Sequence, residues 1–130
     1  MSKKFTLGKT ERLKSRKIID QLFSEGKAFT QSPFRVHYLF AGTMTAPLQF
    51  GAGASTRNFK KAVDRNRIKR LIKEAWRLQK PLVAETVKEQ NTPLAVFVIY
   101  TAKELPAYDE VVDKMQKITG RLCTLVTAKK

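Results

Sequence analysis

Cysteine and histidine are almost absent from this sequence of 130 residues, which holds one of each, Cys123 and His37. One cysteine excludes a disulfide framework, and the two residues together are too few for a Cys/His zinc site. Nucleophilic and acid-base catalysis need partnered side chains, and neither residue has a candidate partner in its sequence context. The loops G-x-x-x-x-G-K-S/T and G-x-G-x-x-G are also missing. We therefore expect no catalytic side chains, and no cofactor or metal bound by the protein alone.

Long apolar runs are lacking as well. The longest, Leu94 to Tyr100, has seven residues, against the ~20 that a membrane-spanning helix needs. Residues 1–6 carry no apolar signal-peptide core. Together with the single cysteine, which suits a reducing compartment, these features predict a cytoplasmic protein without a membrane segment.

Acidic residues are scarce relative to basic ones. The chain has 11 Asp and Glu against 26 Lys and Arg, a formal net charge of +15. Residues 1–80 carry 19 basic and 5 acidic residues, whereas residues 81–130 carry 7 and 6. The excess indicates a polyanionic partner, and its concentration in one part of the chain indicates a defined binding site.

The length fits a single domain over residues 1–130, with flexible ends at 1–9 and 127–130. Apolar periodicity predicts helices at 15–25, capped by Ser15 and ended by Gly26, at 62–79, limited by Pro81, and from Asp109 to Leu125. Strands are predicted at 34–40, at 48–54 after a turn at 42–47, and at 94–100, with a short helical turn within 81–92. This order predicts an α/β (α+β) two-layer sandwich with three to four strands and about three helices.

Two strands carry further information. The segment 94–100 is apolar throughout, so we expect a central strand covered on both faces. In the strand 48–54, Gly51 and Gly53 favour a close approach of the backbone.

The helix predicted at 62–79 is the most basic part of the chain. At 100° per residue, polar side chains gather opposite its apolar stripe, which consists of Ile68, Leu71, Ile72 and Ala75. The polar group comprises Asn66, Lys69, Arg70, Lys73, Arg77 and Lys80, with Arg65 and Arg67 on its flanks and Arg57, Lys60 and Lys61 just before the helix. Four like-charge i,i+4 pairs cost the free helix about 1 to 2 kcal/mol, which a bound anion would relieve. Guanidinium groups suit phosphate oxygens, so we predict that this face binds nucleic acid.

The segment from Arg65 to Arg77, RNRIKRLIKEAWR, resembles the signature helix of the bacterial ribonuclease P protein family. The resemblance covers about residues 5–80 and includes residues 11–14, Phe23, Gly26, the strand 34–39 and the Gly-containing strand before Ala62. The chain departs from the family in the turn Ser55-Thr56-Arg57, where one basic residue stands in place of the usual pair.

The resemblance implies a mixed sheet with a left-handed crossover between parallel strands, against the general preference. It also implies an RNA partner: the RNA subunit of ribonuclease P removes the 5′ leader of precursor tRNA with magnesium, and the protein binds that RNA and the leader. Carried onto this sequence, the residues that face RNA are Arg65, Asn66, Arg67, Lys69, Arg70 and Lys73. A cleft between the first helix and the sheet, lined by Ile19, Phe23, Arg35 and His37, would hold the leader.

The residue positions alone agree with such a cleft. Ile19 and Phe23 share one edge of the first helix, and Ile18 and Leu22 share the other. Arg35 and His37 lie on the strand face opposite Phe34, where a cation and a stackable ring suit single-stranded bases. The alternative is that Phe23 belongs to the core.

Other functions share some of these features. A ribosomal or other structural RNA-binding protein would have the same basic helix without an associated cleavage. A DNA recognition helix fits less well, because the basic helix is flanked by strands rather than by a partner helix. A membrane-surface helix also fits less well, because its apolar stripe is accounted for by packing on a sheet. The partners that the resemblance implies are ribonuclease P RNA and the precursor tRNA leader, and we expect neither DNA nor a membrane as a partner.

Overall fold

The computed structural model describes residues 13, 16–40, 48–90 and 92–128. In this part of the chain the elements follow in the order α1 (Arg16–Glu25), β1 (Lys27–Gln31), β2 (Phe34–Phe40), β3 (Leu48–Ala54), α2 (Ala62–Gln90), β4 (Leu94–Tyr100) and α3 (Tyr108–Ala128). All the predicted helices and strands are present. The predicted cap Ser15, the turn at 42–47 and the ends 1–9 and 129–130 lie outside the described residues, whereas Thr127 and Ala128 form the end of α3.

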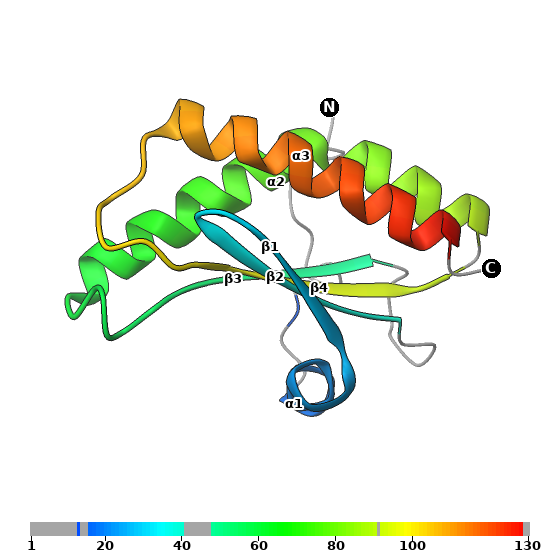
Figure 1. The fold of residues 1–130 in the computed structure, drawn as a ribbon, viewed down its shortest axis with the longest axis horizontal. Coiled ribbons are helices and arrows are strands. Elements are labelled where there is room, and N and C mark those ends of the chain that lie inside the picture. Colours follow the sequence, from blue (N-terminus) through cyan, green and yellow to red (C-terminus); the bar gives the residue numbers. More distant parts are fainter. Residues whose placement is uncertain (1–12, 14–15, 41–47, 91, 129–130) are drawn as a thin grey trace, which may run out of the picture.

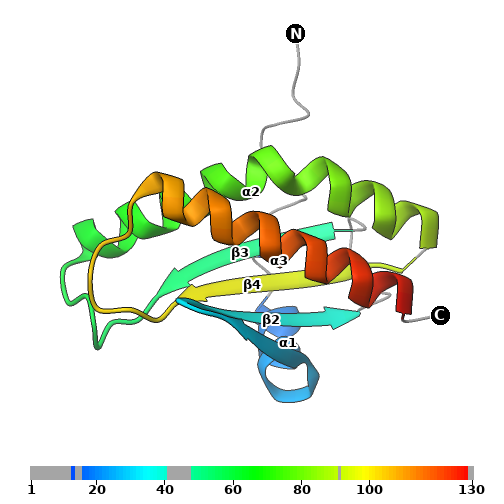
Figure 2. The same ribbon diagram turned by 45° about the horizontal axis from the view of Figure 1, so that its top comes forward.

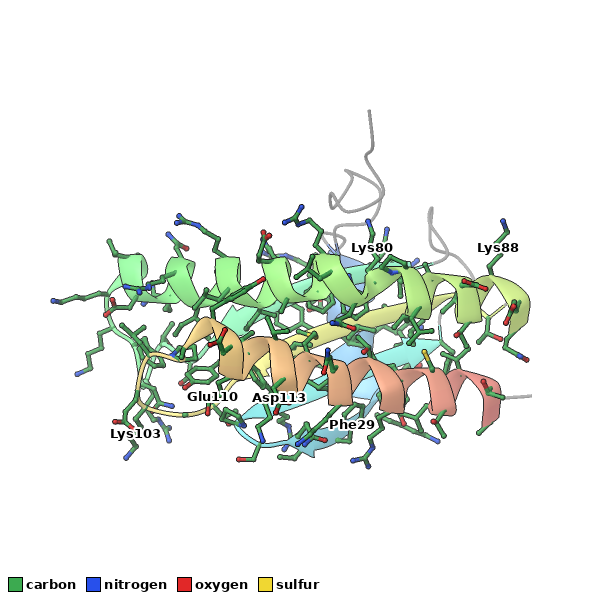
Figure 3. All side chains as sticks on the ribbon, turned by 90° about the horizontal axis from the view of Figure 1, so that it is seen from above. Phe29, Lys80, Lys88, Lys103, Glu110 and Asp113 are labelled. Carbon is green, nitrogen blue, oxygen red and sulfur yellow. The ribbon has the colours of Figure 1, made fainter. Side chains whose placement is uncertain are left out.

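The four strands form one mixed sheet in the order β1-β2-β4-β3. The pairs β1/β2 and β2/β4 are antiparallel, and β3/β4 is parallel, so β4 is the central strand that the sequence predicts. The parallel pair is joined through α2. Seen from the side of α2 with β3 and β4 pointing upward, β4 lies to the left of β3 (Figures 2 and 3), so this crossover has the unusual left hand.

The helices are divided unequally between the two faces of the sheet. Figure 1 shows α2 and α3 side by side on one face and α1 alone on the other. The predicted α+β sandwich is confirmed, with α1 as an addition on the second face. The buried residues Ile18 and Leu22 attach α1 to Leu13 and Ala95. Because one short helix cannot cover four strands, Phe97 and Ile99 of β4 stay half-buried, so the central strand is fully covered on one face only.

The main core lies between the sheet and the pair α2/α3. Its largest fully buried side chain, Trp76 of α2, stacks on Phe50 of β3 with ring centroids 4.2 Å apart and planes 9° apart. Ile68 and Ile72 extend this contact toward the start of α2, and Met115 and Ile118 contribute from α3. The stack fixes α2 against the sheet, and with it the direction in which the basic residues point.

The helix α2 is longer than the sequence indicates. It runs for 29 residues to Gln90 and contains Pro81, so the prediction that Pro81 limits the helix is wrong. Proline removes one backbone hydrogen bond and disfavours a helix interior. Here the apolar stripe continues beyond Pro81 with Val83 and Val87, which are buried in the same core as the apolar residues of α3. This packing outweighs the cost of the proline in the helix.

The strand β1 has no counterpart among the predicted ranges. Its sequence KAFTQ has one buried residue, Phe29, which Arg121 of α3 covers at 4.4 Å from the ring centroid. Gly26 allows the tight passage from α1 into β1. A Cβ atom there would lie 2.7 Å from the Tyr38 carbonyl oxygen and closer still to that of Leu22. No helix in the described residues is long and apolar enough to cross a membrane.

Candidate nucleic-acid interface

The exposed side of α2 and the loop before it carry most of the residues predicted to bind nucleic acid. Arg67, Arg70 and Lys73 are exposed along the helix together with Asn66, and Arg57, Lys60 and Lys61 are exposed in the loop that leads into it. We call these seven residues the basic face. The apolar stripe beneath it is buried, because Ile68, Ile72 and Ala75 pack into the core. The sequence therefore placed these side chains on the correct side of the helix.

Arg65 has a structural contact in addition to its charge. Its Nη1 donates hydrogen bonds to the carbonyl oxygens of Phe59, at 2.8 Å, and Lys60, at 2.9 Å. It therefore fastens the loop before α2 to the first turn of the helix. Arg77 is likewise engaged, in an ion pair with Glu74. Both are half-buried, so they are less available to RNA than Arg67 and Arg70.

The sequence predicts Lys80 in the exposed polar group of α2, but in the structure its side chain is not part of that group. It is only 5% exposed. The reason is its spacing, because Trp76 four residues before it and Val83 three residues after it are both buried, and positions at this spacing share one side of a helix. Lys69 is half-buried. The basic face therefore ends nearer to the N-terminus of α2 than the sequence predicts.

On the other face of the sheet, three aromatic rings meet beside α1. The Phe23 ring lies 4.6 Å from the His37 ring and 5.6 Å from the Phe97 ring, measured between centroids. Phe23 is 46% exposed, which argues against the alternative that it belongs to the core. The structure thus brings Phe23 and His37 together as predicted, and we call the group Phe23, His37 and Phe97 the aromatic patch.

The other two residues of the predicted cleft border this patch. Ile19 is half-buried beside Leu39 and Phe97, while Arg35 is exposed two residues from His37 on the same strand face. Burial, and secondarily the positive charge of Arg35, lower the pKa of His37 below its usual value. The imidazole is therefore neutral at neutral pH and offers an uncharged ring to a ligand.

Phe97 was not identified from the sequence. In the sheet it pairs with His37 on one side and with Gly51 on the other. A Cβ atom at Gly51 would lie 2.7 Å from the Phe97 ring, and one at Gly53 would lie 3.0 Å from it. The close approach predicted at these glycines is therefore made by a side chain, and the glycines leave room for the ring across β3.

Metal-binding groups do not converge in the described residues, where no set of three or more His, Cys, Asp or Glu side chains could hold a metal ion. The interface consists instead of cations on α2 and in the loop before it, and of rings on α1 and the sheet. Such a pair of surfaces can bind a phosphate backbone and unstacked bases.

Comparisons with known proteins agree with this chemistry. The sequence model of the family described as Ribonuclease P matches residues 7–123. The ribonuclease P protein component of Porphyromonas gingivalis strain ATCC 33277 is 37% identical over 119 residues, which cover 91% of this chain and 87% of that protein. That of Rippkaea orientalis is 36% identical over 85 residues, which cover 63% of this chain and 67% of that protein.

Solved structures share the fold. The RNase P protein of Staphylococcus aureus superposes with a TM-score of 0.68 at 17% identity, over 85% of this chain and 93% of that one. The RNase P protein of Thermotoga maritima superposes with a TM-score of 0.66 at 24% identity, over 85% and 96%. Since the family match spans most of the sequence and a relative above 30% identity spans nearly all of it, the chain belongs to the ribonuclease P protein component family.

Proposed function

We propose that this protein binds the RNA subunit of ribonuclease P through the basic face and the 5′ leader of precursor tRNA through the aromatic patch. In this way it assists magnesium-dependent removal of the leader. The observation that carries the proposal is the presence of two chemically different surfaces on different layers of the fold. Clustered cations suit a phosphate backbone, and exposed rings beside Arg35 suit unstacked bases.

Catalysis belongs to the RNA in this proposal. The described side chains form no nucleophile–base pair, since Cys123 contacts Thr86 and the Leu82 carbonyl, and His37 contacts Phe23. The magnesium ions used by the complete enzyme are assigned to RNA phosphates. The protein contributes binding and orientation, and its cations reduce repulsion between the phosphates of enzyme and substrate.

The first prediction concerns cleavage itself. Precursor tRNA incubated with protein alone should stay intact at any magnesium concentration, because no side chain in the described part of the chain is placed to activate water. Protein added to the ribonuclease P RNA of the same organism should accelerate cleavage at low magnesium concentration. The measurement is the rate of appearance of 5′-matured tRNA on a denaturing gel. Cleavage by RNA-free protein that survives repurification contradicts the proposal, and RNA binding without acceleration favours a structural RNA-binding protein.

The second prediction concerns the leader. The double variant Phe23→Ala/His37→Ala should bind precursor tRNA at least tenfold more weakly in the assembled enzyme, because base stacking on one ring contributes about 1 to 3 kcal/mol. Affinity for mature tRNA, which has no leader, should not change. The measurement is the dissociation constant of the two RNAs.

The matched control for this variant is Tyr108→Ala, which removes an exposed ring at the start of α3, outside the patch. It should leave both affinities unchanged. If the double variant has a lower melting temperature and binds precursor and mature tRNA more weakly by the same factor, the assignment of the leader to the aromatic patch is wrong.

A further inference from the structure

A hollow of about 640 Å³ lies where the parallel strands β3 and β4 end. Two segments distant in the sequence form it, the turn between β3 and α2 and the loop between β4 and α3. Its lining residues are Ser55, Thr56, Arg57, Asn58, Thr101 and Lys103. We call it the strand-end hollow. Of these residues, only Arg57 is predicted from the sequence to bind nucleic acid.

Hydrogen bonds hold the walls of this hollow in place. The Ser55 hydroxyl accepts from the backbone amides of Arg57, at 3.1 Å, and Asn58, at 3.4 Å. The Asn58 amide donates to the Thr101 carbonyl at 3.0 Å and to that of Ala102 at 3.4 Å, which ties the two segments together. A ligand would therefore meet a backbone that is already held in place.

Its charge is of one sign. Arg57 and Lys103 are both exposed, and no carboxylate is among the six lining residues. Successive residues of the loop after β4 line two different hollows. Thr101 and Lys103 line the strand-end hollow, whereas a second hollow is lined by Tyr100, Ala102 and Glu104 together with Glu110. The alternation separates Lys103 from the neighbouring acidic side chains. Two cations and the hydroxyls of Ser55 and Thr56 thus line one hollow, whereas the Thr101 hydroxyl donates to the Pro33 carbonyl at 2.8 Å.

We propose that the strand-end hollow binds a phosphodiester of RNA between Arg57 and Lys103. The proposal rests on the proposed function and deepens it, because Arg57 belongs both to the hollow and to the basic face. A bidentate guanidinium and a mobile ammonium are complementary ways to hold one phosphate, and the hydroxyls of Ser55 and Thr56 supply further donors. Lys103 thereby provides from a distant loop the second cation that the turn Ser55-Thr56-Arg57 lacks.

The test compares Arg57→Gln, Lys103→Gln and the double variant with Lys88→Gln. Lys88 is a matched control because it is an exposed lysine at the opposite end of α2 (Figure 3). The measurement is the dissociation constant of each protein for the ribonuclease P RNA of the same organism over a series of salt concentrations. Each hollow variant should weaken binding about fivefold to tenfold, while Lys88→Gln changes it less than twofold.

A shared phosphate makes a sharper prediction for the double variant. The factor by which the double variant loses affinity for the RNA should be smaller than the product of the factors for the two single variants, because both residues hold the same phosphate. The slope of log K against log salt should flatten by roughly 0.7 to 0.9, the value for one phosphate. Unchanged melting temperatures would confirm that the exposed substitutions leave the fold intact.

The same variants locate the phosphate. A loss of affinity for the RNA subunit alone assigns the phosphate to that RNA, and a loss seen only when the assembled enzyme binds precursor tRNA assigns it to the substrate. If Lys103→Gln behaves like Lys88→Gln in both assays, the inference is wrong while the proposed function stands. If the unsubstituted protein fails to bind the RNA subunit, the proposed function fails and the inference with it.

Discussion

Replacing Trp76 with alanine is expected to lower the free energy of unfolding by about 3 to 5 kcal/mol, the range for large aromatic residues in a core. Trp76 is 1% exposed and forms the stacked contact between α2 and β3. Its loss leaves a cavity under the basic face, so RNA binding should fall as well. The measurement is urea denaturation followed by circular dichroism.

Two controls separate packing from other effects of this substitution. Trp76→Phe keeps a ring on Phe50 and should cost clearly less than the alanine variant. Leu78→Ala, at an exposed position on the same helix, should stay within about 0.5 kcal/mol. A loss below about 1 kcal/mol for Trp76→Ala would contradict the packing of α2 on the sheet.

Neutralising Arg67 and Arg70 together is expected to weaken binding of the ribonuclease P RNA about a hundredfold. Both are exposed on the basic face, and each charged contact to a phosphate contributes roughly a factor of ten. With about five phosphates neutralised by the intact face, the slope of log K against log salt should be roughly −3.5 to −4.5. The double variant should flatten that slope by about 1.4 to 1.8.

The control for this pair removes the same charge elsewhere. Lys88→Gln/Lys117→Gln changes two exposed lysines on α2 and α3 outside the basic face. The ion pair of Lys117 with Asp113 is exposed and contributes little. Equal losses for the two double variants would mean that net charge, rather than the basic face, determines binding. Arg65→Ala is a poorer probe, because it also releases the loop that Arg65 holds through the carbonyl oxygens of Phe59 and Lys60.

Much of the fold follows from the period of the apolar residues. Strands β2, β3 and β4 and helices α1 and α3 have clear patterns, and the structure places them within a few residues of the predicted ranges. The failures occur where local signals are weak or misleading. The strand β1 has a single buried residue, and Pro81 is a strong local signal that tertiary packing of Val83 and Val87 overrides.

The residues of the candidate site likewise fall into those that the sequence predicts and those that it does not. Helical angle and strand alternation correctly place Arg67, Arg70, Phe23 and His37, because those rules depend on one element at a time. Phe97 and Lys103 require two elements to be placed relative to each other. The register of β4 between His37 and Gly51, and the tie of Asn58 to the loop after β4, are tertiary facts that a single sequence does not contain.

The strand order has a consequence for how this chain folds during synthesis. The central strand β4 is the last of the four strands to be synthesised. It must enter between β2 and β3, which do not pair with each other. Until residues 94–100 leave the ribosome, only the hairpin β1/β2 and the helices α1 and α2 can form, and β3 has no partner strand in the sheet. Contacts so far apart in sequence form slowly. A nascent chain that ends before β4 therefore exposes two apolar strand edges, and the basic helix α2 emerges before the sheet that will orient it.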